Sequence, residues 1–230
     1  MRFKAIGFDF DGTLMMSEGA KGTMMAKAFS EFEEISSHLL EEIAKAYPHL
    51  VGRGHSRDEK IKIIAENVLG YGLSSKVKRN IAKSFGKKYV KSLDHCPLFA
   101  CNKLIEQLGS QVEHMFLLSL EDQKEVRAVA KHCDLSRYFE VVLGGPTGKV
   151  EHFKKLLKKW KLHPSEMLYI GDSHGDSVVA KKVGIKGVLI DSNKGHAALH
   201  KMLGADFEVG SLCDVKSMFK QMKYKFLKKS

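Results

Sequence analysis

Two aspartates near the start of the chain follow an apolar segment. Phe3 to Phe8 has the character of a short buried strand, and Asp9 and Asp11 come directly after it. Side chains two residues apart on a strand face the same way, so both carboxylates should line one crevice, while Gly12 lets the backbone turn away. Two crowded acids repel each other unless a cation shares the site, which favours a hard metal such as Mg²⁺. One acid can then act as a nucleophile and the other as a proton shuttle.

The pattern of an apolar strand that ends in polar groups returns further along the chain. Met167–Ile170 runs through a glycine into Asp172 and Asp176. Between the two acidic segments, Ser119 ends another apolar run, and Lys149 follows a glycine-rich stretch. The carboxyl ends of parallel strands lie at one edge of a sheet, where open α/β sheets bind ligands. The sequence therefore predicts that these side chains meet there.

In order and rough spacing, this set of residues resembles the four motifs of the haloacid dehalogenase-like superfamily, specifically its phosphatase branch. One departure is Leu120, because the family often has Asn or Gly directly after the serine. The resemblance implies an α/β fold with a Rossmann-like parallel core, and a Mg²⁺-dependent reaction on a small phosphorylated substrate. The residues that carry it are Asp9, Asp11, Ser119, Lys149, Asp172 and Asp176.

The resemblance also implies a role for each of these residues. Asp9 would attack phosphorus and form an aspartyl-phosphate; Asp11 would protonate the leaving oxygen, later activate water, and touch the metal through its backbone carbonyl. Ser119 and Lys149 would bind phosphoryl oxygens. For Asp176, a metal contact, a pair with Lys149 and a helix N-cap are all open. The implied metal ligands are Asp9, Asp11, Asp172 and Asp176.

Residues 16–92 show helical patterns and almost no strand signal, at the place where the family inserts a helical cap. Within this insert, Gly52–Arg57 resembles the specificity loop of phosphoglycolate phosphatases and β-phosphoglucomutases, which implies that Arg57 meets a distal anionic group of the substrate. A solvated loop arginine is the alternative. Phosphomutases carry a histidine at the position of Lys21, and lysine is a poorer general acid/base for sugar hydroxyls, so hydrolysis is favoured over a phosphomutase.

Strand and helix signals alternate after residue 93. Such βα repetition predicts a parallel sheet with helices on both faces, formed by residues 1–15 and 93–230 around the all-helical cap at 16–92. The expected strands are 115–119, 140–143, 167–170 and 187–190. The expected helices are 99–108, 122–132, 150–160, 176–183, 196–203 and 212–222.

The 230 residues carry a formal net charge of +11. No apolar run reaches the roughly 18 residues of a membrane span and no signal segment precedes the first strand, so a cytoplasmic protein without a membrane partner is expected. The positive charge is spread out, and no aromatics interleave with it as a nucleic-acid groove would require. A monomer or homodimer is expected. The alternative outside enzymes is a basic binding protein that keeps the fold without turnover.

Overall fold

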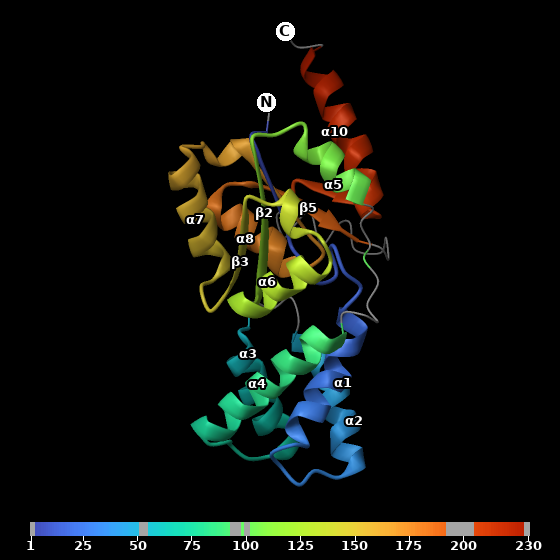
Figure 1. Cartoon of the computed structure of the whole chain (residues 1–230), viewed down its shortest axis with the longest axis vertical. Coiled ribbons are helices and arrows are strands. Elements are labelled where there is room, and N and C mark those ends of the chain that lie inside the picture. The colour runs from blue at the N-terminus through green and yellow to red at the C-terminus, as the bar shows by residue number, and fades with distance from the viewer. Residues whose placement is uncertain (1–2, 51–54, 93–97, 99–101, 192–204, 228–230) are drawn as a thin grey trace.

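The computed structural model describes residues 3–50, 55–92, 98, 102–191 and 205–227. This part of the chain contains a six-stranded sheet in the order β3-β2-β1-β4-β5-β6, and every pairing in it is parallel (Figure 1). The predicted α/β architecture is confirmed. The strands are β1 (Ala5–Phe8), β2 (His114–Asp122), β3 (Val141–Gly145), β4 (Met167–Gly171), β5 (Lys186–Ile190) and β6 (Phe207–Val209).

Two features of the sheet differ from the sequence prediction. β2 runs past Ser119 as far as Asp122, because Asp122 pairs with Gly145 of β3 beyond an irregularity in the register. The edge strand β6 was not predicted, since three residues are too few to show a period. The predicted helix at 196–203 and the first residues of the one at 99–108 lie outside the described residues.

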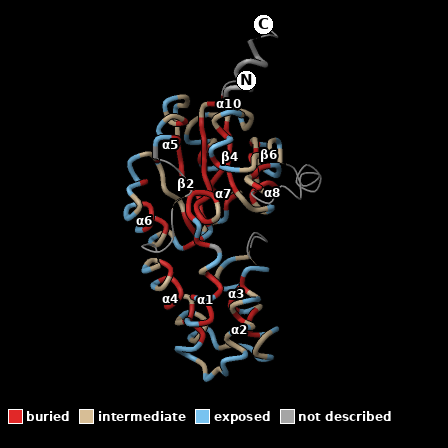
Figure 2. Tube along the Cα trace, turned by 90° about the vertical axis from the view of Figure 1, so that its right-hand side faces the viewer, coloured by how far each residue is buried: buried red, intermediate tan, exposed pale blue. Residues whose placement is uncertain are grey.

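Successive side chains of the central strands point to opposite faces of the sheet, and a layer of helices covers each face, as is usual for a parallel sheet. On one side, Ile6 and Phe8 join a hydrophobic cluster with α5 (Asn102–Gly109), α6 (Gln123–His132) and α10 (Leu212–Leu227). On the other side, Ala5 and Phe116 pack with α7 (Lys149–Trp160) and α8 (His174–Val183). The prediction of helices on both faces is confirmed, and Figure 2 shows the buried residues concentrated along the strands.

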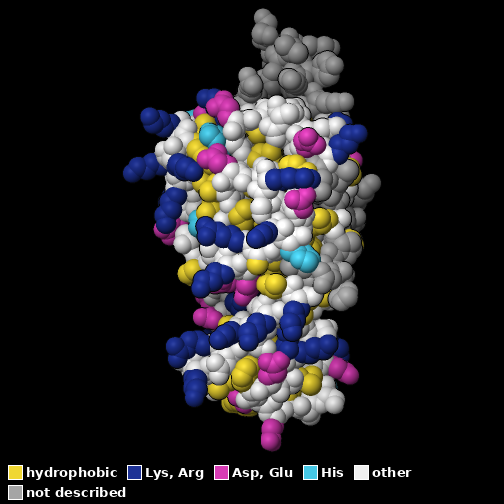
Figure 3. Space-filling model, in the orientation of Figure 1, with side chains coloured by type: hydrophobic (Ala, Val, Ile, Leu, Met, Phe, Trp, Pro, Cys, Tyr) yellow, Lys and Arg dark blue, Asp and Glu magenta, His cyan; other side chains and the backbone are white. Residues whose placement is uncertain are grey.

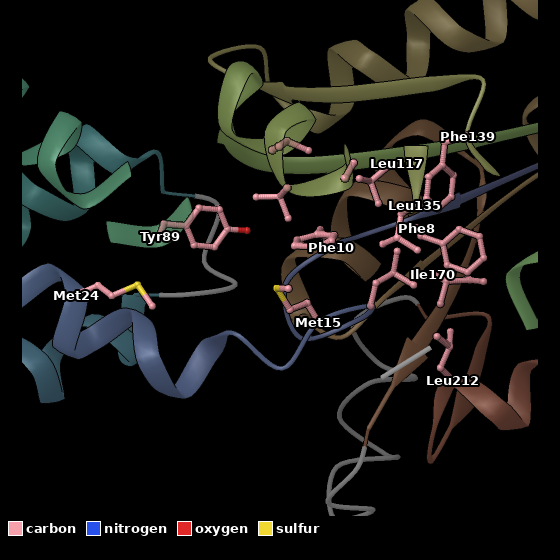
Figure 4. Packing of buried hydrophobic residues seen from close by; sticks show 14 of the residues in the cluster. Phe8, Phe10, Met15, Met24, Tyr89, Leu117, Leu135, Phe139, Ile170 and Leu212 are labelled. Carbon is pink, nitrogen blue, oxygen red and sulfur yellow. The ribbon is translucent and has the colours of Figure 1, made fainter. Parts of the chain in front are cut away.

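Four helices that follow β1 in the sequence form a second body below the sheet in Figure 1, here called the helical lobe. All four fall within the segment 16–92, where helical patterns were expected. Figure 4 shows the Tyr89 ring of this lobe facing Phe10, which follows β1; Met24 of the lobe and Met15 belong to the same hydrophobic cluster. The helices are α1 (Glu18–Phe29), α2 (Ser37–Ala46), α3 (Arg57–Ile64) and α4 (Ser75–Lys91).

Serine caps determine where three of these helices begin. The side chains of Ser36, Ser56 and Ser74 each accept a hydrogen bond from a backbone N–H three residues later. At α3, the carboxylate of Glu59 accepts a hydrogen bond from the backbone N–H of Ser56 and completes a capping box. Arg57 therefore stands in the first turn of a well-defined helix. None of the helices in the described part of the chain combines the length and apolar character needed to cross a membrane.

Candidate active site

β1 ends in the two predicted carboxylates, and both are buried. The backbone N–H of Asp9 donates to the carbonyl of Ile170 at 2.8 Å, so the sheet pairing continues into the site. Asp9 and Asp11 are only 8% and 6% exposed. Gly12 has φ of +76°, and a Cβ there would lie 2.0 Å from Oδ2 of Asp172. Glycine is needed here because the chain turns through the left-handed region while Asp172 approaches closely.

β4 delivers the second pair of acids. A Cβ on Gly171 would lie 2.5 Å from the carboxyl carbon of Asp176, so glycine again permits the approach. Ser173 is the N-cap of α8: its Oγ donates to Oδ2 of Asp176 at 2.6 Å and accepts from the Asp176 backbone at 3.2 Å. Asp176 is thus the third residue of the helix in a capping box, and the N-cap alternative for it is wrong.

Lys149, the first residue of α7, connects the two acidic segments. Its Nζ lies 2.8 Å from Oδ1 of Asp9 and 2.5 Å from Oδ1 of Asp176, and it donates to the Tyr169 hydroxyl at 2.9 Å. Burial alone would lower the pKa of Lys149, but Asp176 and Asp9 outweigh it and raise the pKa above its usual range. Lys149 is therefore a buried cation in the site rather than a surface lysine.

Three carboxylates are arranged as a metal would require. Oxygens of Asp9, Asp172 and Asp176 lie within 4.8 Å of one another. Burial raises the pKa of Asp9 to about 7 in spite of Lys149, and Asp176 and Asp11 add to the rise. One ammonium does not balance the charge of these acids, so the cluster favours a further cation. Because all the donor atoms are oxygens, a hard divalent cation such as Mg²⁺ fits them. The carboxylate of Asp11 lies outside this group, so only its backbone carbonyl is left for the predicted metal contact.

Ser119 reaches the same edge from β2 and is 2% exposed. Its Oγ accepts the backbone N–H of Glu121 at 3.2 Å, and its hydroxyl can donate to a phosphoryl oxygen. The departure after Ser119 does not break the strand, because β2 continues through Leu120. The six residues of the predicted core site thus converge from β1, β2, β4 and the starts of α7 and α8.

Asp11 is held by three side chains, and sequence reasoning identified none of them as its partner. Oδ1 accepts from the hydroxyls of Ser17 and Tyr89, and Oδ2 lies 2.9 Å from Nζ of Lys21. Burial and the charge of Asp11 raise the pKa of Tyr89 well above its ordinary value, so its hydroxyl stays protonated and donates. Tyr89 is 78 positions from Asp11, and no spacing rule connects residues so distant.

Arg57 lies between the helical lobe and the sheet, bound by two carboxylates. Its Nη2 is 2.5 Å from an oxygen of Glu121 on β2 and 2.5 Å from one of Glu125 on α6, and its Nη1 is 2.9 Å from the other Glu125 oxygen. A substrate anion would have to compete with both acids for the guanidinium. The substrate contact predicted for Arg57 stays a prediction, and residues 51–54 before it lie outside the described residues.

The six core residues line one pocket of about 440 Å³ between the helical lobe and the sheet, and the residues that line it do not include Arg57. Its polar lining includes Asp9, Asp11, Lys21, Lys60, Ser119, Glu121, Lys149, Asp172 and Asp176, and its wall also contains the exposed side chains of Leu120 and Val178. A second hollow of about 460 Å³ lies along α4 and is lined by four lysines with Glu31. Figure 3 shows lysines and arginines spread over the helical lobe. Only the first hollow combines clustered acids with a buried cation among the described residues.

Known proteins resemble this chain in sequence and in fold. Phosphoglycolate phosphatase from Mannheimia succiniciproducens is 27% identical over 198 residues, which are 81% of this chain and 85% of that protein. A predicted phosphoglycolate phosphatase from Haemophilus somnus has a similar structure, with TM-score 0.74, 21% identity, and coverage of 95% of this chain and 99% of its own.

The HAD-hydrolase YfnB from Bacillus subtilis, solved bound to magnesium, superposes with TM-score 0.69 at 14% identity over 96% of this chain and 100% of its own. Likeness at this identity shows a shared fold. The family model described as haloacid dehalogenase-like hydrolase matches residues 6–190, from β1 to the end of β5 and across all six residues of the predicted core site. The chain therefore belongs to the haloacid dehalogenase-like hydrolase family.

Proposed function

We propose that this protein is a Mg²⁺-dependent phosphatase that hydrolyses a small phosphorylated metabolite through an aspartyl-phosphate on Asp9. The observation that carries the proposal is the position of Lys149, whose Nζ contacts both Asp9 and Asp176 within the cluster of carboxylates. A buried ammonium beside a carboxylate nucleophile offers the charge that a transferring phosphoryl group needs.

In the first half of the reaction, a carboxylate oxygen of Asp9 attacks phosphorus and the bond from phosphorus to the leaving oxygen breaks. Asp11 gives a proton to that oxygen, so the product leaves as an alcohol. Lys149 and the Ser119 hydroxyl bind the phosphoryl oxygens during the transfer. In the second half, Asp11 takes a proton from a water that attacks the aspartyl-phosphate, and inorganic phosphate and the free carboxylate of Asp9 result.

When bound, Mg²⁺ would supply positive charge that lets a phosphate dianion approach four acids. Asp9, Asp172 and Asp176 would hold it through carboxylate oxygens, and Asp11 through its backbone carbonyl. Thr13 supports this arrangement, because its hydroxyl donates to Oδ1 of Asp172 at 3.2 Å and orients that side chain.

We further propose that the helical lobe is a cap which selects the leaving group, and that the substrate is phosphoglycolate-like or sugar-phosphate-like. The helical lobe supplies one wall of the pocket through Lys21 and Lys60. The phosphoryl-binding groups come from the rest of the described chain, which is built around the sheet and is here called the sheet lobe. The named relatives support the first substrate type. Hydrolysis is favoured over a phosphomutase because Lys21 already contacts both Asp11 and Glu121 with its ammonium, which makes it a poor acceptor of a sugar proton.

The test is a screen of small phosphorylated metabolites, with Mg²⁺ and with EDTA, using the wild type and Asp9→Asn. Asparagine fills the same volume but cannot form the phosphoenzyme, so turnover should be lost while the thermal unfolding curve is kept. Acid quenching with labelled substrate should trap a phosphoenzyme in the wild type and none in the variant. Asp134→Asn, at an exposed turn paired with Arg137, is the matched control and should keep full activity.

Substantial turnover by Asp9→Asn would refute the covalent mechanism, and full activity in EDTA would refute the metal requirement. Absence of phosphatase activity together with steeply salt-dependent nucleic-acid affinity would instead support the alternative of a basic binding protein.

A further inference from the structure

Glu121 is a buried acid in the pocket that no step of the proposed reaction uses. It lies on β2 two residues after Ser119 and is 7% exposed. One of its oxygens lies 3.1 Å from Nζ of Lys21, and the other lies 2.5 Å from Nη2 of Arg57. Burial would raise the pKa of Glu121, but Lys21 and Arg57 outweigh it and hold the pKa well below its usual range. Glu121 is therefore a carboxylate at any physiological pH.

The Lys21 ammonium contacts two carboxylates, Asp11, which follows β1, and Glu121 on β2. Its Nζ is 2.9 Å from Oδ2 of Asp11 and 3.1 Å from Oε1 of Glu121, and the residue is 3% exposed. A lysine has a flexible four-carbon stem, so a single ion pair leaves its ammonium several positions. A second carboxylate, Glu121, reduces the positions open to the ammonium and favours the one that contacts Oδ2 of Asp11.

We propose that Glu121 is a positioning residue that holds the Lys21 ammonium against Oδ2 of Asp11 and thereby orients Asp11 toward the leaving oxygen. The inference rests on the proposed phosphatase function. It predicts that loss of the Glu121 charge harms the proton transfer to the leaving group, which depends on the direction of the Asp11 carboxyl. Attack by Asp9 and binding of the phosphoryl group do not depend on Lys21.

Glu125 allows a purely structural role of Glu121 to be tested, because both acids bind Arg57. Glu125 binds the same guanidinium, through both of its oxygens, at 2.9 and 2.5 Å. It lies on α6, and its described contacts do not include Lys21. If Glu121 only joined the helical lobe to the sheet through Arg57, its loss and the loss of Glu125 should have the same effect. Glu125→Gln is therefore the matched control for Glu121→Gln.

The experiment compares kcat/KM for two probes in Mg²⁺. β-Glycerophosphate has a poor alkoxide leaving group that needs the proton, whereas p-nitrophenyl phosphate has a good leaving group that hardly does. In Glu121→Gln, the ratio of the two kcat/KM values, alkyl over aryl, should fall by about 10-fold to 100-fold, the range expected when an acid/base group is misplaced by about an ångström. In Glu125→Gln the ratio should stay within about 2-fold of wild type, because Asp11 keeps its orientation.

The ratio does not depend on how much of a variant is folded, because both rates scale with the same amount of active enzyme. Glu121→Asp, which keeps the charge but withdraws the carboxylate from Lys21, gives the second measurement and should lower the ratio less. A double-mutant cycle with Lys21→Met completes the test: once the ammonium is absent, Glu121→Gln should change the ratio by no more than about 2-fold.

Equal ratios in Glu121→Gln and Glu125→Gln would overturn the positioning role, as would a full additional effect of Glu121→Gln in the Lys21→Met background. Either result would leave the phosphatase function intact. If the wild type hydrolyses neither probe in Mg²⁺, the proposed function fails and the inference fails with it. The two failures are therefore distinguishable.

Discussion

Replacing Lys149 with methionine removes the ammonium that contacts both Asp9 and Asp176, while a side chain of similar length stays in place. Lys149 is 7% exposed, so these are buried ion pairs. Removal of one partner from a buried pair costs about 3–5 kcal/mol because the remaining charge is left without compensation. We expect the metal-free variant to lose about that much free energy of unfolding at about pH 8, together with its activity.

The loss should depend on pH and on metal in a defined direction. The folded-state pKa of Asp9 is about 7, so Asp9 is mostly ionised near pH 8, whereas near pH 5.5 it carries a proton and no longer needs the ammonium. The deficit of the variant should therefore shrink as the pH falls through about 7. Saturating Mg²⁺ should also restore part of it, because the cation supplies positive charge among the same oxygens.

Urea unfolding of the wild type and Lys149→Met, at both pH values and with EDTA or Mg²⁺, measures these differences. The matched control is Lys155→Met on the same helix, where an exposed lysine pairs with Glu151 at 2.8 Å and its removal should change little. A Lys149→Met deficit equal to that of Lys155→Met, or one that grows at acid pH, would refute the reasoning that Lys149 balances ionised Asp9 and Asp176.

Three further predictions follow from the same geometry. Because the folded pKa of Asp9 is about 7, above its ordinary 3.8, the metal-free protein should lose stability as pH rises between these values. For the same reason, Mg²⁺ binding should release up to about one proton near pH 6 and almost none near pH 8.5, which calorimetry in two buffers measures. Tyr89→Phe removes a hydroxyl 2.9 Å from Asp11 and should lower kcat for alkyl phosphates with a stability loss of about 1.5–3 kcal/mol. The control Tyr138→Phe, which removes a hydroxyl that only accepts an exposed hydrogen bond from Arg137, should not lower kcat. Arg57→Ala should lower kcat/KM for a substrate with a second anionic group, by an amount equal to about 1.5–3 kcal/mol of activation free energy, and should leave kcat/KM for p-nitrophenyl phosphate unchanged. Equal effects on both substrates would show that Arg57 only joins the helical lobe to the sheet.

The residues of the core site could be predicted from the sequence because each acidic pair stands close to the apolar strand that positions it. Asp9 and Asp11 stand directly after a strand, and Asp172 and Asp176 stand after another; a parallel sheet brings both strand ends to one edge. β1 and β4 are fully buried and β-like throughout, so apolar runs were sufficient to find them. The glycines between strand and acid reinforced the pattern.

Contacts between the two bodies of the molecule could not be predicted in this way. Lys21 and Glu121 are 100 positions apart, and Arg57 and Glu121 are 64 apart. Each residue alone is an ordinary charged side chain. The hydrophobic periodicity of its helix or strand does not indicate which distant residue it will contact. Tyr89 likewise looks like one more apolar residue in the stripe of α4, which it is, except for the hydroxyl that reaches Asp11.

The charge of the helical lobe illustrates why composition and site electrostatics have to be separated. Residues 16–92 contain more Lys and Arg than Asp and Glu, which together with Arg57 favours a small substrate that is additionally anionic or polyhydroxylated. In the folded protein, Lys21 and Arg57 already face carboxylates of the sheet lobe, Glu121 among them. Net charge counts cations wherever they lie, whereas a pocket attracts an anion only with charge that its own acids leave unbalanced. To bind Arg57, a second anionic group on the substrate must therefore compete with Glu121 and Glu125 for the guanidinium, and the measured preference between phosphoglycolate and a sugar phosphate without a second anionic group reports whether it does.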